Sequence, residues 1–415
     1  IKTILGFLVL SVGAGVLVGS LDPLGQMFEQ AFHIQGIIPN NEAIVSIALG
    51  EYEAMTAYIM AFGMIFNIFI ARFTRLKYIF LTGHHTLYMA CMIAIILRVA
   101  DFDGVQLVLV GSIILGLIMA LFPAMAQRHM RRITGNDDIA FGHFGTLGYV
   151  LSGFVGEAVG KGSKSTEDMN LQKNLSFLRD SSISISLTMM VIYLILAVLS
   201  GREFVETNLS GGDNYLVYSI IQAITFAAGV FIILSGVRLI LGEIIPAFKG
   251  FSEKMVPSAK PALDCPVVFP YAPNAVLVGF LFSFLGGIVG LLVLGQLNMV
   301  LILPGVIPHF FCGATAGVFG NATGGRRGSM LGAFANGLLI TFLPVMLLPV
   351  LGSLGFANTT FSDADFGLVG IILGNMARYM DKNVITIIAV AILAILVALN
   401  YMMPKKKMPE ADAAK

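Results

Sequence analysis

The sequence predicts an all-α, polytopic membrane protein made of two inverted structural repeats, with about ten to eleven spanning helices plus re-entrant hairpins. Three observations predict this class. The 415 residues are 57% hydrophobic and 12% charged, against roughly 25% charged residues in soluble domains. Apolar stretches close to the roughly 20 residues that a bilayer requires recur along the chain. Small and turn-forming residues of the first half reappear in the second half at a nearly constant separation.

The charge balance and the cysteines narrow the possible partners and cofactors. The formal net charge is +1, so the chain lacks the bulk basic character of nucleic-acid-binding proteins, and membrane lipid is its expected surrounding. The cysteines Cys91, Cys265 and Cys312 are scattered without a Cys-x-x-Cys spacing. They indicate neither a disulfide framework nor a metal knuckle, and we interpret them as small packing residues. No cofactor is expected.

The first half begins inside an apolar stretch, at Ile1 and without an initiator methionine, so we expect one more spanning helix upstream. Ile1–Ser20 is predicted to span the membrane, and Leu21–Phe32 to lie at the interface as an amphipathic helix. Gly36–Ala43 is polar and interrupted by glycine and proline, which is tolerated only where the backbone is buried in protein or lines a cavity. Further spanning helices are predicted at about Met55–Arg72, Tyr78–Leu97 and Val105–Ala126.

A second polar stretch, Gly135–Gly145, opens an apolar segment that ends at Gly160 and is short for a full span. We predict a re-entrant hairpin here. Lys161–Asp180 is charged and solvated, and Ser182–Ser200 crosses the membrane again. An excess of Lys and Arg in short loops marks the cytoplasmic side, which places on that side the basic residues Arg72, Arg75, Lys77, Arg128, Arg131 and Arg132.

Residues 1–200 and 215–403 are predicted to be the two repeats, followed by a cytoplasmic tail over residues 404–415. Five positions recur 223 residues later: Gly6, Gly13, Gly19, Pro23 and Phe28 match Gly229, Gly236, Gly242, Pro246 and Phe251. The match continues with small slips, because Leu81-Thr82-Gly83 faces Leu303-Pro304-Gly305, and Phe141-Gly142 faces Phe366-Gly367. A repeat with an odd number of crossings must be inverted, as is common in secondary transporters.

The second repeat has its own interrupted stretch, Lys260–Pro266, which falls opposite Pro39–Glu42 in the repeat register. Matching interruptions in two halves are the best sequence indication of a substrate site near the membrane midplane. Spanning helices are predicted at about Ala275–Leu297, Val300–Phe319, Gly332–Leu351 and Val384–Met403, with a hairpin near Phe366–Arg378. The last span is followed by three lysines that we expect to be cytoplasmic, Lys405, Lys406 and Lys407.

Polar side chains inside the apolar stretches form the candidate site, because ionisable groups at membrane depth are costly and are normally kept for function. The adjacent His84 and His85 are at its centre. Histidine, asparagine and tyrosine both donate and accept hydrogen bonds, and carboxylates accept hydroxyl protons, so the set suits a small polyhydroxylated ligand. A structural role stays open for single members, as a carbonyl cap, a helix cap or an ion pair. The other candidates are Asn41, Glu42, Thr82, Tyr88, His143 and Asp264.

Two other classes of site use the same residues. His84, His143 and the two carboxylates offer an N2O2 shell for a metal ion. Adjacent histidines are not expected to share one helix face, however, and no His-x-x-His spacing occurs. His84 and His143 could instead be the axial ligands of a haem in a membrane electron-transfer subunit. A Soret band would identify that class, but it leaves the neighbouring Asn41 and Glu42 unexplained.

Several longer motifs resemble the ascorbate-specific membrane component, enzyme IIC, of the bacterial phosphotransferase system. The similarity covers nearly the whole chain, and its motifs are long and typical of the family. They are Asp264-Cys265, Ala272–Val276, Leu303–Phe311 and Gly317–Phe319, together with Ile1–Ile4, Leu81–His84 and Gly142-His143.

The resemblance implies a homodimer in the bacterial inner membrane, in which a substrate-carrying core moves, elevator-like, against a V-shaped dimerisation domain. It also implies that the core takes up L-ascorbate, and that cytoplasmic IIA and IIB proteins supply the phosphoryl group that is transferred to the sugar. The chain has no P-loop or kinase motif for that chemistry, so the residues of phosphoryl transfer are expected on the partners.

The substrate contacts of the family carry over by residue type to His84, His143 and Asp264. Three other places differ from the Thr-Tyr, Gln and Gln of ascorbate members. A pentitol, galactitol or another sugar acid is therefore the alternative substrate within the same superfamily. The differing places are Asn41-Glu42, Tyr88 and Phe144.

Overall fold

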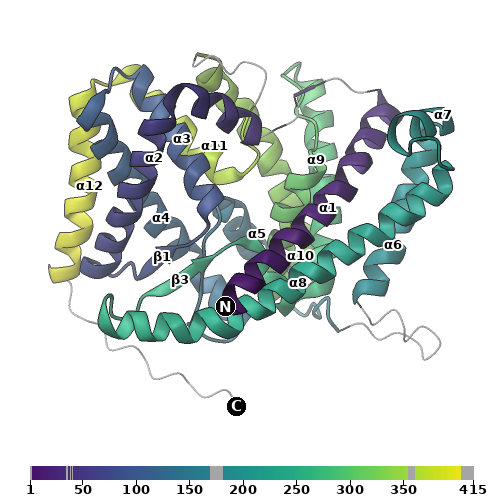
Figure 1. Ribbon diagram of the computed structural model, residues 1–415, viewed down its shortest axis with the longest axis horizontal. Coiled ribbons are helices and arrows are strands. Elements are labelled where there is room, and N and C mark those ends of the chain that lie inside the picture. The colour runs from purple at the N-terminus through teal and green to yellow at the C-terminus, as the bar shows by residue number, and fades with distance from the viewer. Residues whose placement is uncertain are drawn as a thin grey trace.

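The protein is a bundle of long helices around a small parallel sheet (Figure 1). The computed structural model describes residues 2–33, 36–37, 39, 41–168, 181–353 and 360–402. The side chains of some helical residues lie outside this description, among them Glu42 and most of residues 240–253. Within it, seven helices are long and apolar enough to cross a membrane, which confirms the polytopic helical class. They are α1 (Lys2–Phe32), α2 (Asn41–Phe73), α4 (Gly104–Thr134), α8 (Tyr215–Lys254), α9 (Pro273–Gln296), α10 (Val306–Ser353) and α12 (Lys382–Met402).

Helices α1 and α8 cross closely at glycines and form, with α6 (Ser181–Ser200), the long diagonal arm in Figure 1. A Cβ added to Gly13 would lie 2.7 Å from the backbone nitrogen of Ile233, and one added to Gly229 would lie 2.8 Å from that of Leu17. Because contacts further along α1 fall earlier in α8, the two helices run antiparallel. Small residues at the crossing allow this approach, as expected for membrane helices.

Helix α1 corrects the prediction of a span ending at Ser20 and a separate interfacial helix after it. It is continuous through Pro23. The reason is that one face of its last third packs in the core: Leu21, Leu24 and Met27 are at most 3% exposed. The amphipathic pattern of this stretch reflects a helix with one side in the core and the other on a cavity, which sequence periodicity alone does not distinguish from an interfacial helix.

A three-stranded parallel sheet was not predicted by the all-α interpretation. It is formed by β1 (Tyr78–Phe80), β3 (Lys260–Leu263) and β2 (Ala140–Phe141) in the order β1-β3-β2. Tyr78 pairs with Lys260, and Ala140 pairs with Ala262. The predicted span Tyr78–Leu97 is thus a strand followed by α3 (Gly83–Val99), which is only 17 residues long.

The outer edge of β1 is paired by a side chain of α2. Asn67 is fully buried; its Nδ2 donates to the carbonyl of Tyr78 at 3.1 Å, and its Oδ1 accepts from the N–H of Phe80 at 3.0 Å. An unpaired strand edge at this depth would leave costly polar groups without partners. Asn67 therefore lets a strand of three residues persist inside a helical membrane protein.

Helix α10 is two arms joined by a reversal at Gly324 and Gly325, which have non-helical dihedrals. Residues eight apart in one continuous helix are about 12 Å apart. Here a Cβ added to Gly320 would lie 2.2 Å from the carbonyl oxygen of Gly328, so the chain turns back on itself. The two arms overlap the predicted spans Val300–Phe319 and Gly332–Leu351, although the first arm begins at Val306.

The remaining elements complete the bundle. The predicted hairpin after Gly135 is β2 followed by α5 (Thr146–Val159), and the hairpin near Phe366 is α11 (Ala364–Tyr379). Short helical turns, α7 (Arg202–Phe204), η2 (Val205–Leu209) and η3 (Cys265–Tyr271), connect the longer elements. The tail over 404–415, with its three lysines, and residues 169–180 of the charged stretch lie outside the described residues.

Candidate functional site

A cavity of about 1010 Å³ lies between α1 and the ends of the three strands. One wall is a stripe of α1 that carries Asp22, Gln26 and Glu29, and the opposite wall holds most of the predicted site residues. On that wall, the cavity is lined by Asn41, Thr82, His84, His85, Tyr88, His143 and Asp264.

The parallel sheet is what brings the predicted residues together. Parallel strands present their carboxyl ends at one edge, where ligands commonly bind. The segment after β1 holds His84 and His85, the one after β3 holds Asp264, and the one after β2 holds His143. Further bonds extend the ladder beyond the strands: Leu81 donates to the carbonyl of Ala262 at 3.0 Å, and Gly142 donates to that of Leu263 at 2.7 Å. Segments far apart in sequence thereby meet at one point.

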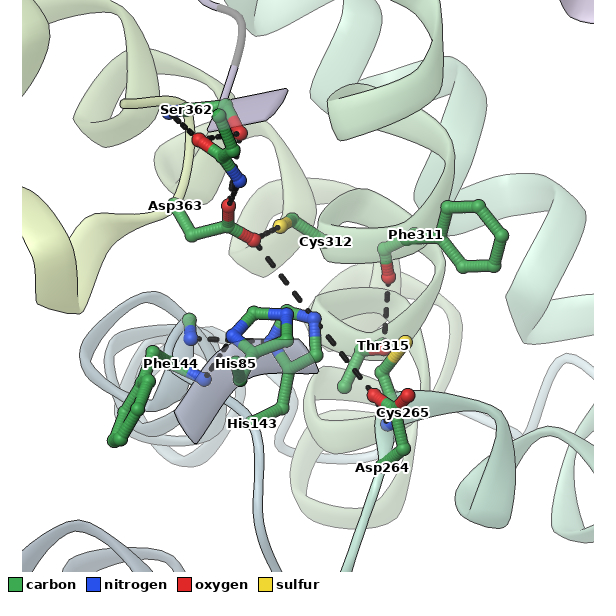
Figure 2. Close-up of polar contacts among 12 residues, drawn as sticks. His85, His143, Phe144, Asp264, Cys265, Phe311, Cys312, Thr315, Ser362 and Asp363 are labelled. Carbon is green, nitrogen blue, oxygen red and sulfur yellow. Dashed lines mark hydrogen bonds and ion pairs between the residues drawn. The ribbon is translucent and has the colours of Figure 1, made fainter. Parts of the chain in front are cut away.

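His143 lies between two carboxylates (Figure 2). Its Nδ1 accepts a hydrogen bond from the backbone N–H of Gly145 at 3.1 Å, so the neutral ring carries its proton on Nε2. That nitrogen is 3.9 Å from Asp264 Oδ1 and 3.8 Å from Asp363 Oδ1. Both separations exceed the roughly 3.2 Å of a direct N–H···O hydrogen bond. A ligand atom placed beside Nε2 and one of these carboxylates can therefore accept a hydrogen bond from the Nε2–H.

His85 is oriented in the same way by a neighbouring backbone. Its Nδ1 accepts from the N–H of Phe144 at 3.2 Å, and its ring lies 3.9 Å, centroid to centroid, from that of His143. The Phe144 ring itself is fully buried and stacks on Phe80 at 4.7 Å. The structure therefore places the Phe144 side chain behind the site, away from the cavity, while its backbone supports His85 (Figure 2).

His84 and Asp264 form the more accessible part of the site. His84 is 51% exposed, and its Nε2 lies 3.7 Å from Oδ2 of Asp264. Oδ1 of Asp264 accepts from the N–H of Cys265 at 2.6 Å and so caps η3. Tyr88 packs edge-on against His84 at 5.9 Å. His84 and His85 both reach the cavity, contrary to the expectation for adjacent helix positions, because α3 begins at the cavity wall.

Asn41 begins α2 and is engaged with residues that precede α11. Its Nδ2 donates to Asp363 Oδ2 at 2.7 Å, and its Oδ1 accepts from the N–H of Ser362 at 2.9 Å. Asn41 thus lines the cavity while its amide holds α2 against α11. Glu42 follows in the first turn of α2, and its side chain lies outside the described residues.

Two aspartates of the site were missed from sequence. Asp363 lines the cavity, and the fully buried Asp365 accepts from the N–H groups of Thr146 and Leu147 at 2.8 Å each, capping α5. The signal that could have found them is the Ser362-Asp363-Ala364-Asp365 run directly before an apolar segment, a typical helix start. The predicted hairpin began at Phe366, directly after this run, and so excluded both aspartates.

The charge on the cavity wall comes from acidic side chains and from helix ends. Among the described lining residues there are four carboxylates and no Lys or Arg: Asp22, Glu29, Asp264 and Asp363. Helices α3 and α10 begin at the cavity with no acidic residue in their first turns, and α3 has no side-chain cap. The dipoles of both helix starts, together with the first backbone N–H groups of α3, favour a negative group on a ligand.

The histidine hydrogen bonds weigh against the metal and haem interpretations. The ligand atoms of His85, His143 and Asp363 lie within 4.8 Å of one another, close enough for a shared ion. A metal or haem iron needs a ring nitrogen without a proton. At His143 and His85, Nδ1 already accepts a backbone N–H, so ligation through Nε2 would move the ring proton to Nδ1 and break that bond.

Comparison with protein families matches residues 1–365 to EIIC-GAT, described as a PTS system sugar-specific permease component. A curated relative is the ascorbate-specific PTS system EIIC component of Mycoplasma pneumoniae (strain ATCC 29342 / M129 / Subtype 1), 24% identical over 386 residues. The alignment covers 80% of this chain, and the chain spans about 58% of the length of that relative. The family match extends over most of the chain and includes the strands, the cavity and its histidines. The chain therefore belongs to the sugar-specific permease components of the phosphotransferase system, the EIIC-GAT family, and is a multi-pass membrane protein.

Proposed function

We propose that this protein carries a small polyhydroxylated sugar acid, L-ascorbate in the first place, across the bacterial inner membrane. The observation that carries the proposal is a set of three donor–acceptor gaps in one cavity. His84 to Asp264, His143 to Asp264 and His143 to Asp363 are separated by 3.7, 3.9 and 3.8 Å. Each separation is too long for a direct hydrogen bond and short enough for one hydroxyl group beside the pair to accept from the histidine and donate to the carboxylate. The single Nε2–H of His143 serves one of its two carboxylates at a time.

Two observations favour an acidic ligand. The starts of α3 and α10 at the cavity wall, neither with an acidic residue in its first turn, stabilise negative charge. The relative from Mycoplasma pneumoniae is described as ascorbate-specific. L-Ascorbate combines several hydroxyl groups with one negative charge at neutral pH, so it fits both the gaps and the helix ends.

A neutral polyol, galactitol or a pentitol, is the second candidate. It is favoured by the four carboxylates that line the cavity without any Lys or Arg among the described lining residues. Those carboxylates repel an anion, although Asp264 and Asp363 each stand at the start of a helix, where the dipole offsets part of their charge. The family description names only a sugar-specific permease.

The coupling to phosphorylation is proposed from the family. The IIB protein, charged by IIA, would transfer its phosphoryl group to the sugar on the cytoplasmic side. The cavity lies between α1 on one side and the strand ends on the other. This position supports an elevator-like movement in which the strands, α3, α5 and α11 carry the sugar past α1 and α8 of a dimerisation arm.

A binding panel on the purified full-length protein tests this function. Titration calorimetry with L-ascorbate, galactitol and a pentitol is expected to give saturable binding of L-ascorbate, weakened by His143→Ala. The matched control is Glu203→Gln, which changes an exposed carboxyl group on α7 that does not line the cavity. Binding of galactitol alone would select the second candidate. Binding of none of the three would refute the sugar site.

A further inference from the structure

Asp363 is a buried carboxylate that joins three elements at the cavity. It precedes α11, and its side chain is 7% exposed. Its Oδ2 accepts from Asn41 Nδ2 at 2.7 Å and from Ser362 Oγ at 2.8 Å. Its Oδ1 accepts from Cys312 Sγ of α10 at 3.0 Å. Among the described residues, its ion-pair contact is with His143 alone, at 3.8 Å.

The acceptor capacity of this carboxylate is nearly used. An ionised carboxylate offers about four lone-pair positions. Asn41 and Ser362 fill the two on Oδ2, and Cys312 fills one on Oδ1. One position on Oδ1 remains. His143 Nε2–H is the facing donor, and it is too far away to fill that position directly.

A buried charge without a cationic partner is costly, and at membrane depth such groups are normally kept for function. Neutral donors from Asn41, Ser362 and Cys312 stabilise the charge of Asp363 and fix the direction of its open Oδ1 position. Asn41 in turn is fixed by Ser362, whose N–H donates to its Oδ1 at 2.9 Å. These bonds leave one acceptor position on Asp363 Oδ1, the oxygen that faces His143 (Figure 2).

We propose that Asp363 is a specificity-determining residue that, together with His143, binds one hydroxyl group of the substrate. The hydroxyl oxygen accepts from His143 Nε2–H, and the hydroxyl proton is donated to Asp363 Oδ1. Asn41 and Ser362 are positioning residues, which hold the carboxylate but do not touch the sugar. This inference rests on the proposed function, since it assigns a role inside the same cavity.

Deletion of single substrate hydroxyl groups tests the pairing. Affinities are measured for wild type and Asp363→Asn, first with L-ascorbate and galactitol as parent ligands, then with analogues of the bound parent that each lack one hydroxyl group. We expect Asp363→Asn to weaken parent binding roughly ten- to hundred-fold, as for loss of a charge-assisted hydrogen bond. We also expect one analogue to bind wild type and Asp363→Asn almost equally, because it lacks the hydroxyl group that Asp363 binds.

A structural role would give a different pattern. If every analogue lost the same factor as the parent on Asp363→Asn, the proposal would be overturned. Asp365→Asn is the matched control: this buried carboxylate two residues away does not line the cavity. It is expected to lower the melting temperature without a hydroxyl-specific effect, and a hydroxyl-specific effect in this control would also overturn the assignment.

A second variant keeps the test decisive if Asp363→Asn does not fold. Asn41→Ala retains the charge of Asp363 and releases its Oδ2. In this variant, deletion of the hydroxyl group that Asp363 binds is expected to reduce ligand affinity by a smaller factor than in wild type. If every hydroxyl deletion reduced affinity by the same factor in Asn41→Ala as in wild type, the proposal would be refuted. Absence of parent binding by the wild-type protein would instead refute the proposed function, and this inference with it.

Discussion

Asp264 combines a structural and a binding role in one side chain. Its Oδ1 caps η3 by accepting from Cys265, while its Oδ2 faces His84. Asp264→Asn retains an oxygen for the cap and removes the charge. Loss of one charge-assisted hydrogen bond costs about 1.5 to 3 kcal/mol, so we expect roughly ten- to hundred-fold weaker substrate binding with little change in melting temperature.

Substrate titration and thermal unfolding of the same purified variant separate the two roles of Asp264. Asp213→Asn, an exposed aspartate before α8, is the control. A lowered melting temperature with unchanged affinity would show that Asp264 serves the scaffold alone.

Asp137, which contacts Lys260 of β3, should make the thermal stability of the protein depend on pH. Burial disfavours its charged form, but hydrogen bonds from Arg131, Lys260 and Gln127 outweigh burial and lower its pKa from 3.8 to about 2. The pKa of Asp137 is lower in the folded protein than in the unfolded chain. Its charge therefore stabilises the fold fully above pH 3.8, and this stabilisation is lost as pH falls from 3.8 toward the folded-state pKa of about 2. Asp137→Asn should therefore melt at a lower temperature than wild type at neutral pH.

The difference in melting temperature between wild type and Asp137→Asn is expected to shrink as pH falls from 3.8 to about 2. Melting curves of both proteins over this range check the sign. A difference that stays constant with pH would show that the side chain stabilises the fold by packing and neutral hydrogen bonds.

At the scale of the elements, the reversal of α10 depends on a glycine. Gly325 has φ +56° and ψ −146°, and a Cβ there would lie 2.4 Å from the carbonyl oxygen of Lys164. Such backbone conformations are strained by about 1 to 3 kcal/mol for residues with a side chain. Gly325→Ala is expected to lower the melting temperature, while Gly15→Ala, where a Cβ meets nothing within 4 Å, should not. Equal melting temperatures for both variants would contradict this account of the turn.

Elements were predictable where they are long and uniformly apolar. The spans at α4, α9 and α12 follow from length and hydropathy alone. The strands were not, because β1 and β2 have three and two residues, too few for a period to show. Tertiary contacts stabilise these strands: the Asn67 side chain pairs with the edge of β1, and the carbonyl of Leu263 accepts from the N–H of Gly142, which follows β2. No local pattern encodes those contacts.

The candidate site was predictable in its polar residues and not in its hydrogen bonds. His84, His143 and Asp264 stand out because polar groups inside apolar stretches are costly. The distinction between a residue that faces the cavity and one that supports it required the structure. Phe144 lies behind the site, and Asn41 holds Asp363, because the sheet and the start of α11 decide where each side chain points.

At the scale of the whole molecule, the inverted repeat stays a prediction, with a pair of contacts in its support. Lys260 donates to the carbonyl of Lys77 at 2.8 Å, and Ile37 donates to that of Leu301 at 2.9 Å. The two donors, Ile37 and Lys260, are 223 residues apart, and the two acceptors, Lys77 and Leu301, are 224 residues apart. The repeat register therefore converts one hydrogen bond into the other, with donor and acceptor in opposite halves. Both pairings are parallel. A homodimer likewise remains a proposal from the family.

The central claim is that substrate hydroxyl groups fill the gaps between the histidines and the carboxylates. A cryo-electron microscopy or crystal structure of the full-length protein with L-ascorbate, at a resolution that shows the ring, tests it most directly. The account predicts one ligand oxygen about 2.8 Å from both His143 Nε2 and a carboxylate oxygen of Asp264 or Asp363. Ligand density confined to the α1 wall near Asp22 and Glu29, with the gaps at His143 unfilled, would contradict it.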